Sequence, residues 1–126
     1  MKYLIDTHVF LWWMVTPERL SPAAREVIET ESTELAFSTV SGWEIAIKSS
    51  LGKLKGVPLA DLPAEIAGFG WTELPLVLHH LPTLAELPFH HRDPFDRALI
   101  AQAMAEKLIF ITRDERAKLY DLPTLW

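Results

Sequence analysis

The alternation of short apolar segments with helical ones is the feature that most constrains the fold. Residues 2–5, 34–38 and 108–111 have strand patterns, and residues 108–111 form the clearest one in the chain. Shorter strands are expected at residues 71–74 and, at a sheet edge, 123–126. Because helices separate these strands, they should pair in parallel. The sequence therefore predicts an α/β fold with a mainly parallel central sheet, in a single domain over residues 1–126.

Capping residues mark where several helices begin and end. Ser21-Pro22 and Asp93-Pro94 each combine an N-cap residue with a proline at the first helical position. Gly52 can end a helix in the left-handed conformation. Helices are expected at residues 9–14, 22–30, 39–51, 60–68, 76–87 (with proline interruptions) and 94–107.

Composition excludes several classes of function. The chain has no cysteine, which excludes disulfides, thiolate zinc sites and a cysteine nucleophile, and fits a cytoplasmic location. A net charge of -5 argues against a protein that only coats nucleic acid, because phosphate contacts need basic side chains. We expect neither a signal peptide nor a membrane span, because Asp6 and His8 interrupt the apolar N-terminus and no later apolar stretch is long enough.

Carboxylates recur where strands end and helices begin. Asp6 follows the first strand, Asp114 follows the strand at residues 108–111, and Glu44 lies early in the helix after the second strand. In a parallel sheet these positions share the carboxyl edge, where sites form. Asp96, in the first turn of its helix, joins them if that helix start faces the same edge. Asp6 and Asp114 could each instead be loop or N-cap acids, so it is their joint placement that indicates a site.

Glu44 lies on the face that we predict to be buried. The apolar stripe of its helix takes Val40, Trp43, Ile47 and Leu51, and an acid on such a face needs a partner or a cation. The alternative is a Glu44–Lys48 pair, worth roughly 0.2–0.5 kcal/mol on a solvated face. We favour the functional interpretation of Glu44 over that pair.

A cluster of acids would need positive charge to form. At about 4 Å and an effective dielectric constant of about 20, each pair of carboxylates repels by roughly 4 kcal/mol. Oxygen ligands without cysteine favour Mg²⁺ or Mn²⁺ over zinc. Such ions suit phosphodiester hydrolysis, because they activate a water and stabilise the leaving oxygen.

Other features remain open or argue against other chemistries. Trp12 and Trp13 cannot both occupy a narrow core stripe, so either one lies in an interface or both pack at the edge of the core. The doublets His79-His80 and His90-His91 have no acid at a metal-binding spacing and are expected to be surface or capping residues. The chain has no Gly-rich phosphate loop and no G-x-S-x-G motif. Asp6-Thr7-His8 lacks the second aspartate that is typical of aspartyl-phosphate-forming hydrolases, so that class is a runner-up only.

Four short motifs in the same order resemble the PIN-domain family, and above all VapC-type toxins of type II toxin–antitoxin systems. Together they span nearly the whole chain, although each is weak alone. They are Leu4-Ile5-Asp6-Thr7-His8, Trp43-Glu44-Ile45-Ala46-Ile47-Lys48, Arg92-Asp93-Pro94-Phe95-Asp96-Arg97-Ala98-Leu99-Ile100-Ala101-Gln102-Ala103 and Ile111-Thr112-Arg113-Asp114.

The resemblance implies a fold, an activity and partners. The fold would be a PIN-like three-layer α/β/α sandwich, and the activity that of an Mg²⁺- or Mn²⁺-dependent endoribonuclease. It also implies a homodimer that is inhibited by a cognate antitoxin. The alternatives are a metal-dependent phosphatase acting on small molecules and a catalytically inactive binding module.

The resemblance also assigns residues. The acidic quartet falls on Asp6, Glu44, Asp96 and Asp114 as catalytic and metal-binding residues, with Thr7, Asp93 and Thr112 in support. A basic patch of Lys48, Lys53 and Lys55 is commonly only a solvated face, but beside an acidic site it could hold RNA phosphates. Arg97 and Arg113 complete the candidate RNA contacts.

Overall fold

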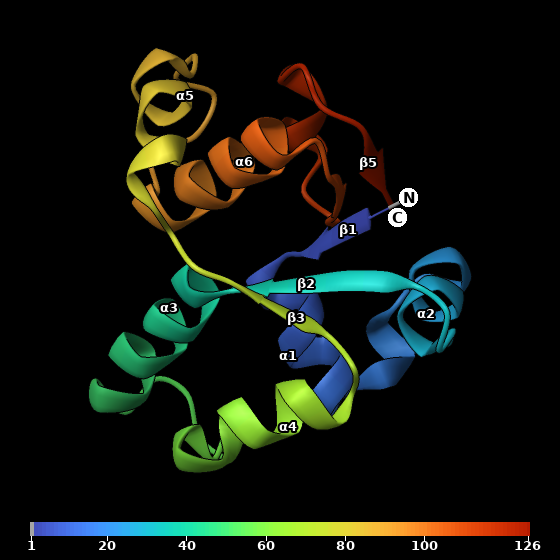
Figure 1. Ribbon diagram of the computed structural model, residues 1–126. Helices are drawn as coiled ribbons and strands as arrows, with labels where there is room; N and C mark the ends of the chain where they lie inside the picture. Colours follow the sequence, from blue (N-terminus) through green and yellow to red (C-terminus); the bar gives the residue numbers. More distant parts are fainter. Residues whose placement is uncertain (1) are drawn as a thin grey trace.

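A five-stranded parallel sheet forms the centre of the molecule. The computed structural model describes residues 2–126 (Figure 1). The strand order is β3-β2-β1-β4-β5, and every pair of neighbouring strands is parallel. The strands are β1 (Lys2–Ile5), β2 (Glu34–Ser38), β3 (Thr72–Leu74), β4 (Ile109–Ile111) and the edge strand β5 (Thr124–Leu125). The predicted parallel α/β fold is confirmed.

Helices cover both faces of the sheet. Helices α1, α2 and α4 lie below the sheet in Figure 1, and α5 and α6 lie above it. The helices are α1 (Thr7–Val15), α2 (Pro22–Glu29), α3 (Thr39–Ser50), α4 (Leu62–Gly68), α5 (Leu81–Glu86) and α6 (Pro94–Glu106), with 3-10 turns at Pro17–Arg19, Leu59–Asp61, Leu78–His80 and Glu115–Leu119. Across residues 2–126, every helix is too short or too polar to cross a lipid bilayer.

Alternation along the strands divides the core into two layers. Successive strand side chains point to opposite faces, so Leu4 packs under α6 while its neighbour Ile5 packs against α1 and α2. Phe110 and Ile111 of β4 divide in the same way. One layer is completed by Phe10 of α1. The three-layer α/β/α sandwich expected from the sequence follows from this division.

The caps expected from the sequence are present. Ser21 Oγ accepts from the amide of Ala24, and Gly52 has a φ of 70°, so it supplies the left-handed conformation that ends α3. Helix α6 begins at its N-cap Asp93 and ends at Lys107, which has a φ of 56°. Because α6 turns directly into β4, its N-terminus lies at the carboxyl edge of the sheet. Asp96 is therefore brought to the edge shared by Asp6 and Asp114.

The predicted buried stripe of α3 is wrong in part. Trp43 and Leu51 are 57% and 61% exposed, whereas Val40, Ser41, Glu44 and Ile45 are buried. The buried face is therefore rotated by about one residue from the one predicted. The cause is that Ser41 packs inward, where its hydroxyl meets Thr7 Oγ1 at 2.8 Å.

Trp12 and Trp13 both pack at the edge of the core. Trp13 joins an aromatic cluster with Phe69 and Trp71, with ring centroids 4.9 and 5.1 Å away. Trp12 lies 5.9 Å from Trp126 and under the guanidinium of Arg19. Both tryptophans are partly buried against the same core layer. Within this chain, both tryptophans therefore pack as the second of the two alternatives describes.

Candidate active site

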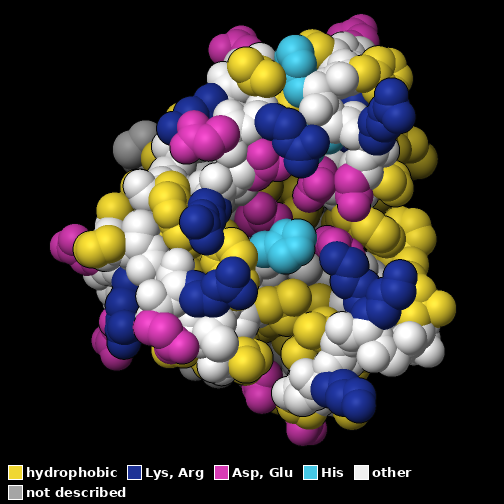
Figure 2. Space-filling view, turned by 180° about the vertical axis from the view of Figure 1, so that it is seen from behind, with side chains coloured by type: hydrophobic (Ala, Val, Ile, Leu, Met, Phe, Trp, Pro, Cys, Tyr) yellow, Lys and Arg dark blue, Asp and Glu magenta, His cyan; other side chains and the backbone are white. Residues whose placement is uncertain are grey.

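A cavity of about 450 Å³ opens at the carboxyl edge of the sheet, where β1, β4 and the start of α6 meet. Figure 2 shows acidic side chains gathered in the hollow of this face, with a histidine beside them and Lys or Arg side chains around the rim. The lining residues are Asp6, His8, Val9, Trp12, Asp96, Arg113, Asp114, Glu115 and Arg116. Three of the four predicted acids thus share one cavity.

Asp6 is buried, and only one of its two carboxylate oxygens has a hydrogen-bond partner. Thr112 Oγ1 donates to Asp6 Oδ2 at 2.7 Å, whereas Oδ1 is buried and has no hydrogen-bond partner. The side chain does not cap α1, although Asp6 is at its N-cap position. Burial raises the pKa of Asp6, and the charge of Glu44 adds to this, while the Thr112 hydrogen bond opposes it. A capping role therefore does not account for this carboxylate.

Glu44 is 2% exposed and reaches the same charge cluster from α3. Its charge raises the pKa of both Asp6 and Asp96, although Glu44 does not line the cavity itself. Lys48 Nζ donates to Glu44 Oε2 at 2.6 Å, and Oε1 is buried without a partner. The ion pair that we disfavoured is therefore present. It forms because the half-exposed lysine reaches back along the helix to a buried acid, so a solvated helix face is not required.

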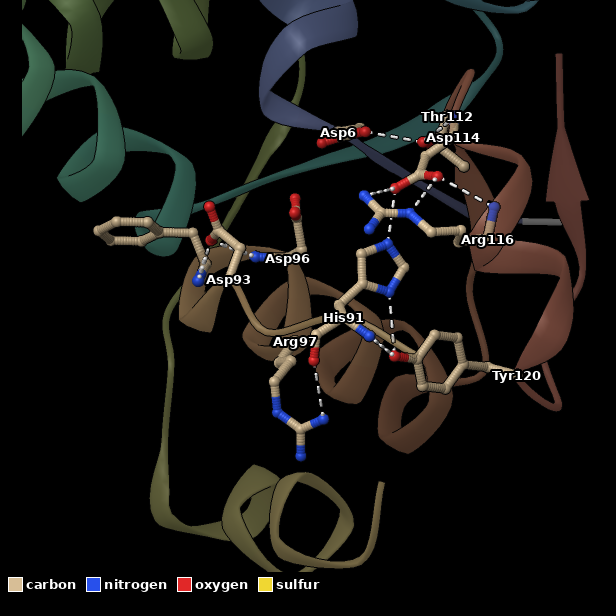
Figure 3. A network of polar contacts seen from close by, with 10 residues as sticks. Asp6, His91, Asp93, Asp96, Arg97, Thr112, Asp114, Arg116 and Tyr120 are labelled. Atoms are coloured by element: carbon tan, nitrogen blue, oxygen red, sulfur yellow. Dashed lines mark hydrogen bonds and ion pairs between the residues drawn. The ribbon is translucent and has the colours of Figure 1, made fainter. Parts of the chain in front are cut away.

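Asp93 and Asp96 have different roles at the start of α6. Asp93 Oδ1 accepts from the amides of Phe95 and Asp96 at 2.8 and 3.2 Å, which confirms Asp93 as the N-cap. Asp96 instead points into the cavity (Figure 3). Burial, and then the charges of Asp6 and Asp93, raise the pKa of Asp96 to about 6. Asp96, like Asp6, therefore needs positive charge nearby to be fully ionised.

Asp114 has the opposite electrostatics. His91 Nε2 lies 2.6 Å from Asp114 Oδ2, and the backbone amide of Arg116 donates to Oδ1 at 3.0 Å. The Arg116 guanidinium lies 3.3 Å from both oxygens. Burial alone would raise the pKa of Asp114, but the hydrogen bonds from His91 and Arg116 outweigh it, and the pKa lies below its usual value. Asp114 is therefore both a cap of the Glu115–Leu119 turn and a cavity acid.

His91 corrects our prediction for the histidine doublets. It is 2% exposed, and it bridges Asp114 and Tyr120, whose hydroxyl lies 3.0 Å from its Nδ1 (Figure 3). The sequence could not reveal this role, because Asp114 lies 23 residues further along the chain. His80 does act as a capping residue, since its Nδ1 accepts from the Val77 amide at 3.2 Å. Arg116 and Tyr120 were also missed.

The two predicted supporting threonines differ in their contacts, and the predicted basic residues differ in whether they line the cavity. The Thr112 hydroxyl joins Asp6 to the amide of Asp114, whereas the Thr7 hydroxyl bonds Ser41. Arg113 lines the cavity, while Lys53 and Lys55 are exposed outside it.

Arg97 does not fit its predicted role as an RNA contact. Its guanidinium donates to the carbonyl oxygens of Pro88, Leu84 and Leu87 and stacks over Phe89 at 4.1 Å. The donors of Arg97 are thus used to fasten the loop before α6. The role of this arginine is structural.

The donor set fits a hard divalent cation. Asp6 Oδ1 and Glu44 Oε1 are buried oxygens without hydrogen-bond partners, which is costly unless a cation binds them. The raised pKa values of Asp6 and Asp96 report the same excess of negative charge. Ligand atoms of His91, Asp96 and Asp114 also lie within 4.8 Å of one another. Carboxylate oxygens of this kind suit Mg²⁺ or Mn²⁺.

The model of the PIN domain family matches residues 3–123. The chain belongs to the PIN-domain family, and its resemblance to VapC-type proteins is confirmed. Ribonuclease VapC22 of Mycobacterium tuberculosis is 30% identical to it over 128 residues, covering 98% of this chain and 97% of that protein.

Solved structures show the same fold. A chain in the crystal structure of VapBC2 from Rickettsia felis, bound to a DNA fragment from their promoter, matches with a TM-score of 0.73. The two are 14% identical, over 99% of this chain and 98% of that one. A chain of a toxin–antitoxin complex from Klebsiella pneumoniae matches with a TM-score of 0.66 at 13% identity, over 98% and 96% of the two chains.

Proposed function

We propose that this protein is an Mg²⁺- or Mn²⁺-dependent endoribonuclease and the toxin of a type II toxin–antitoxin system. The observation that carries the proposal is the pair of buried, unpartnered oxygens, Asp6 Oδ1 and Glu44 Oε1, beside a cavity lined by three further acids. The full-length similarity to a ribonuclease of the VapC type supports the same reaction. A binding module would have no need of such a repulsive cluster.

Each acid has a role in this proposal. Asp6, Glu44 and Asp96 supply the oxygens that hold the cation, and Asp114 completes the set from the opposite wall. When bound, Mg²⁺ or Mn²⁺ would activate a water for attack on phosphorus and stabilise charge on the leaving oxygen. Thr112 fixes Asp6 by donating to Oδ2, which leaves Oδ1 free. Asp93 holds Asp96 in place through the first turn of α6.

RNA would reach the cavity past basic side chains on its rim. Arg113 and Arg116 line the cavity, which supports a role for both in contacting phosphates of the RNA. Lys53 and Lys55 are exposed beyond α3 and would contact RNA further along the strand. Lys48 is bound to Glu44 and serves mainly to balance that acid.

The partners that we propose are RNA, a cognate antitoxin and a second copy of this chain. The names of the matched structures describe toxin–antitoxin complexes, which supports an antitoxin partner here. The large apolar side chains that stay exposed include Trp43 of α3 and Leu78 in the turn before α5. These are our candidates for the dimer and antitoxin contacts. We also propose a cytoplasmic location, on the family resemblance and the absence of cysteine.

The test is cleavage of RNA by the purified protein with Mg²⁺ or Mn²⁺. We expect cleavage by the wild type, its loss in EDTA with recovery on adding Mn²⁺, and its loss in Asp96→Asn. Asp61→Asn, which changes an exposed acid outside the cavity, is the matched control and should cleave as the wild type does. Cleavage that survives both EDTA and Asp96→Asn would exclude the proposal. Turnover of a chromogenic phosphate ester without RNA cleavage would favour the phosphatase alternative instead.

A further inference from the structure

We propose that His91, held by Tyr120, is a positioning residue that aims the Asp114 carboxylate at the cation site. The inference rests on the proposed function, because it takes Asp114 to be part of that site. It concerns a residue that binds no substrate and no cation itself. It also explains why a histidine is buried beside an acidic cavity.

The contacts fix His91 on every side. Its ring extends from the loop before α6 and is buried, with Nε2 2.6 Å from Asp114 Oδ2 and Nδ1 3.0 Å from the Tyr120 hydroxyl. Its ring stacks on that of Tyr120, with centroids 5.5 Å apart. Its backbone amide donates to the same hydroxyl at 3.0 Å. Figure 3 shows these contacts as one continuous chain from Tyr120 through His91 to Asp114.

Asp114 determines which ring nitrogen carries the proton, and the Tyr120 hydroxyl is compatible with it. An ionised carboxylate can only accept, so the short contact to Nε2 needs a proton there, and the Tyr120 hydroxyl, which accepts from the His91 amide, can donate its own proton to Nδ1. A neutral imidazole that accepts at Nδ1 carries its proton on Nε2. That proton points at Asp114 Oδ2. His91 is therefore a fixed donor to the carboxylate.

The same tautomer disfavours His91 as a cation ligand, because binding through Nε2 would first require loss of its proton. His91, Asp96 and Asp114 could hold a metal ion by distance alone. A protonated Nε2 has no lone pair for a metal, so the ligands that remain are carboxylate oxygens. The site then keeps its preference for Mg²⁺ or Mn²⁺ over softer ions.

His91 holds Asp114 more firmly than Arg116 does. The Arg116 side chain is 60% exposed, and its guanidinium nitrogens lie 3.3 Å from the carboxylate. The His91 contact is shorter and its donor ring is buried, so water competes with it less. Outer partners of this kind commonly change metal affinity or activity by about 10- to 100-fold when removed.

The first experiment reads the tautomer directly. In metal-free protein without RNA, ¹⁵N NMR of the ring nitrogens, at a pH where the ring is neutral, should show the His91 proton on Nε2. Asp114→Ala removes the carboxylate that accepts from Nε2, and it should lose this single tautomer. Finding the proton on Nδ1 in the wild type would overturn the proposal.

The second experiment measures cation affinity by calorimetry. His91→Leu should weaken Mn²⁺ and Mg²⁺ by similar factors, about 10- to 100-fold. His91→Gln keeps an amide N–H that can reach Asp114, so it should recover most of that loss. His79→Gln changes an exposed histidine away from the cavity and should bind as the wild type does. A selective loss of Co²⁺ or Zn²⁺ affinity in both His91 variants would instead make His91 a ligand and overturn the proposal.

The experiments distinguish failure of the ribonuclease proposal from failure of the proposed role of His91. If the wild type cleaved no RNA while the tautomer and the cation affinities came out as expected, the ribonuclease proposal would fail and the role of His91 would be supported. If RNA were cleaved in a cation-dependent manner while His91→Leu bound Mn²⁺ normally, the ribonuclease proposal would be supported and the proposed role of His91 would fail. Thermal unfolding of each variant identifies any loss that comes from misfolding.

Discussion

Two aspartates in one cavity show opposite electrostatics at the scale of single residues. Asp96 has a pKa of about 6, because it is buried and lies beside the charges of Asp6 and Asp93. Asp114 has a lowered pKa, because His91 and Arg116 hydrogen bonds more than offset its burial. The Asp114 carboxylate therefore receives hydrogen bonds from protein donors, whereas the Asp96 carboxylate does not. A cation would be bound most strongly by the acids that lack donors.

Asp96→Asn should stabilise the metal-free protein above about pH 6. The folded pKa lies above the unfolded value of 3.8, so the folded state binds more protons between 3.8 and about 6. Ionised Asp96 therefore destabilises the folded state. The effect is absent below pH 3.8, grows as the pH rises to about 6 and is complete above that. With allowance for solvent screening of a partly exposed group, we expect a gain of roughly 1–2 kcal/mol. Urea unfolding in EDTA measures this.

The pH dependence is the decisive part of that experiment. The advantage of Asp96→Asn over the wild type should be small near pH 4 and reach its full size near pH 7.5, as expected on either side of the titration window. Asp61→Asn, at an exposed position, should show no such trend. An advantage that did not change with pH would mean that the charge of Asp96 is not its source.

At the scale of elements, the start of α6 shows a cap and a functional acid within one turn. Asp93→Ala should destabilise the protein by about 1 kcal/mol, because the amides of Phe95 and Asp96 lose their acceptor. Asp93→Asn keeps an oxygen for those amides and should retain most stability and activity, whereas Asp96→Asn should lose activity. Thermal unfolding and RNA cleavage of the three variants check this. Loss of activity in Asp93→Asn with retention in Asp96→Asn would reverse the assignment.

The sequence predicted the elements well where the cause is local. Ser21, Asp93 and Gly52 specify helix ends through contacts with their own neighbours, and all three act as expected. Burial of Glu44 was also predicted, but from the wrong stripe, because Ser41 turns inward to meet Thr7 and leaves Trp43 outside. Local periodicity cannot show that a polar pair between two helices replaces an apolar residue.

Contacts that are distant in sequence account for what was missed at the site. The partner of His91 is 23 residues away, so no spacing rule links them. Thr112 and Asp6 are 106 residues apart, and they meet only because β1 and β4 are neighbours in the sheet. The strand order is therefore the information that a single sequence lacks.

At the scale of the whole molecule, the parallel sheet gathers negative charge at one edge. The chain has a net charge of -5, and its clustered acids come from the end of β1, from α3 and from α6, which the fold brings together. The repulsion among them weakens the fold unless a cation is present. Stability and cation binding are therefore expected to be coupled in this protein.

Mn²⁺ should accordingly raise the melting temperature of the wild type by several degrees. A ligand at 100 times its dissociation constant stabilises the folded state by about 2.7 kcal/mol, if it binds only that state. Asp96→Asn and Glu44→Gln should lose most of this shift, since each removes a carboxylate from the cluster. Asp93→Asn is the matched control near the site and should keep the shift, because Asp93 caps the helix instead of binding the ion. Thermal unfolding with EDTA or with Mn²⁺ at several concentrations measures this shift. An equal rise in melting temperature in the wild type and all three variants would mean that the cation binds outside this cluster.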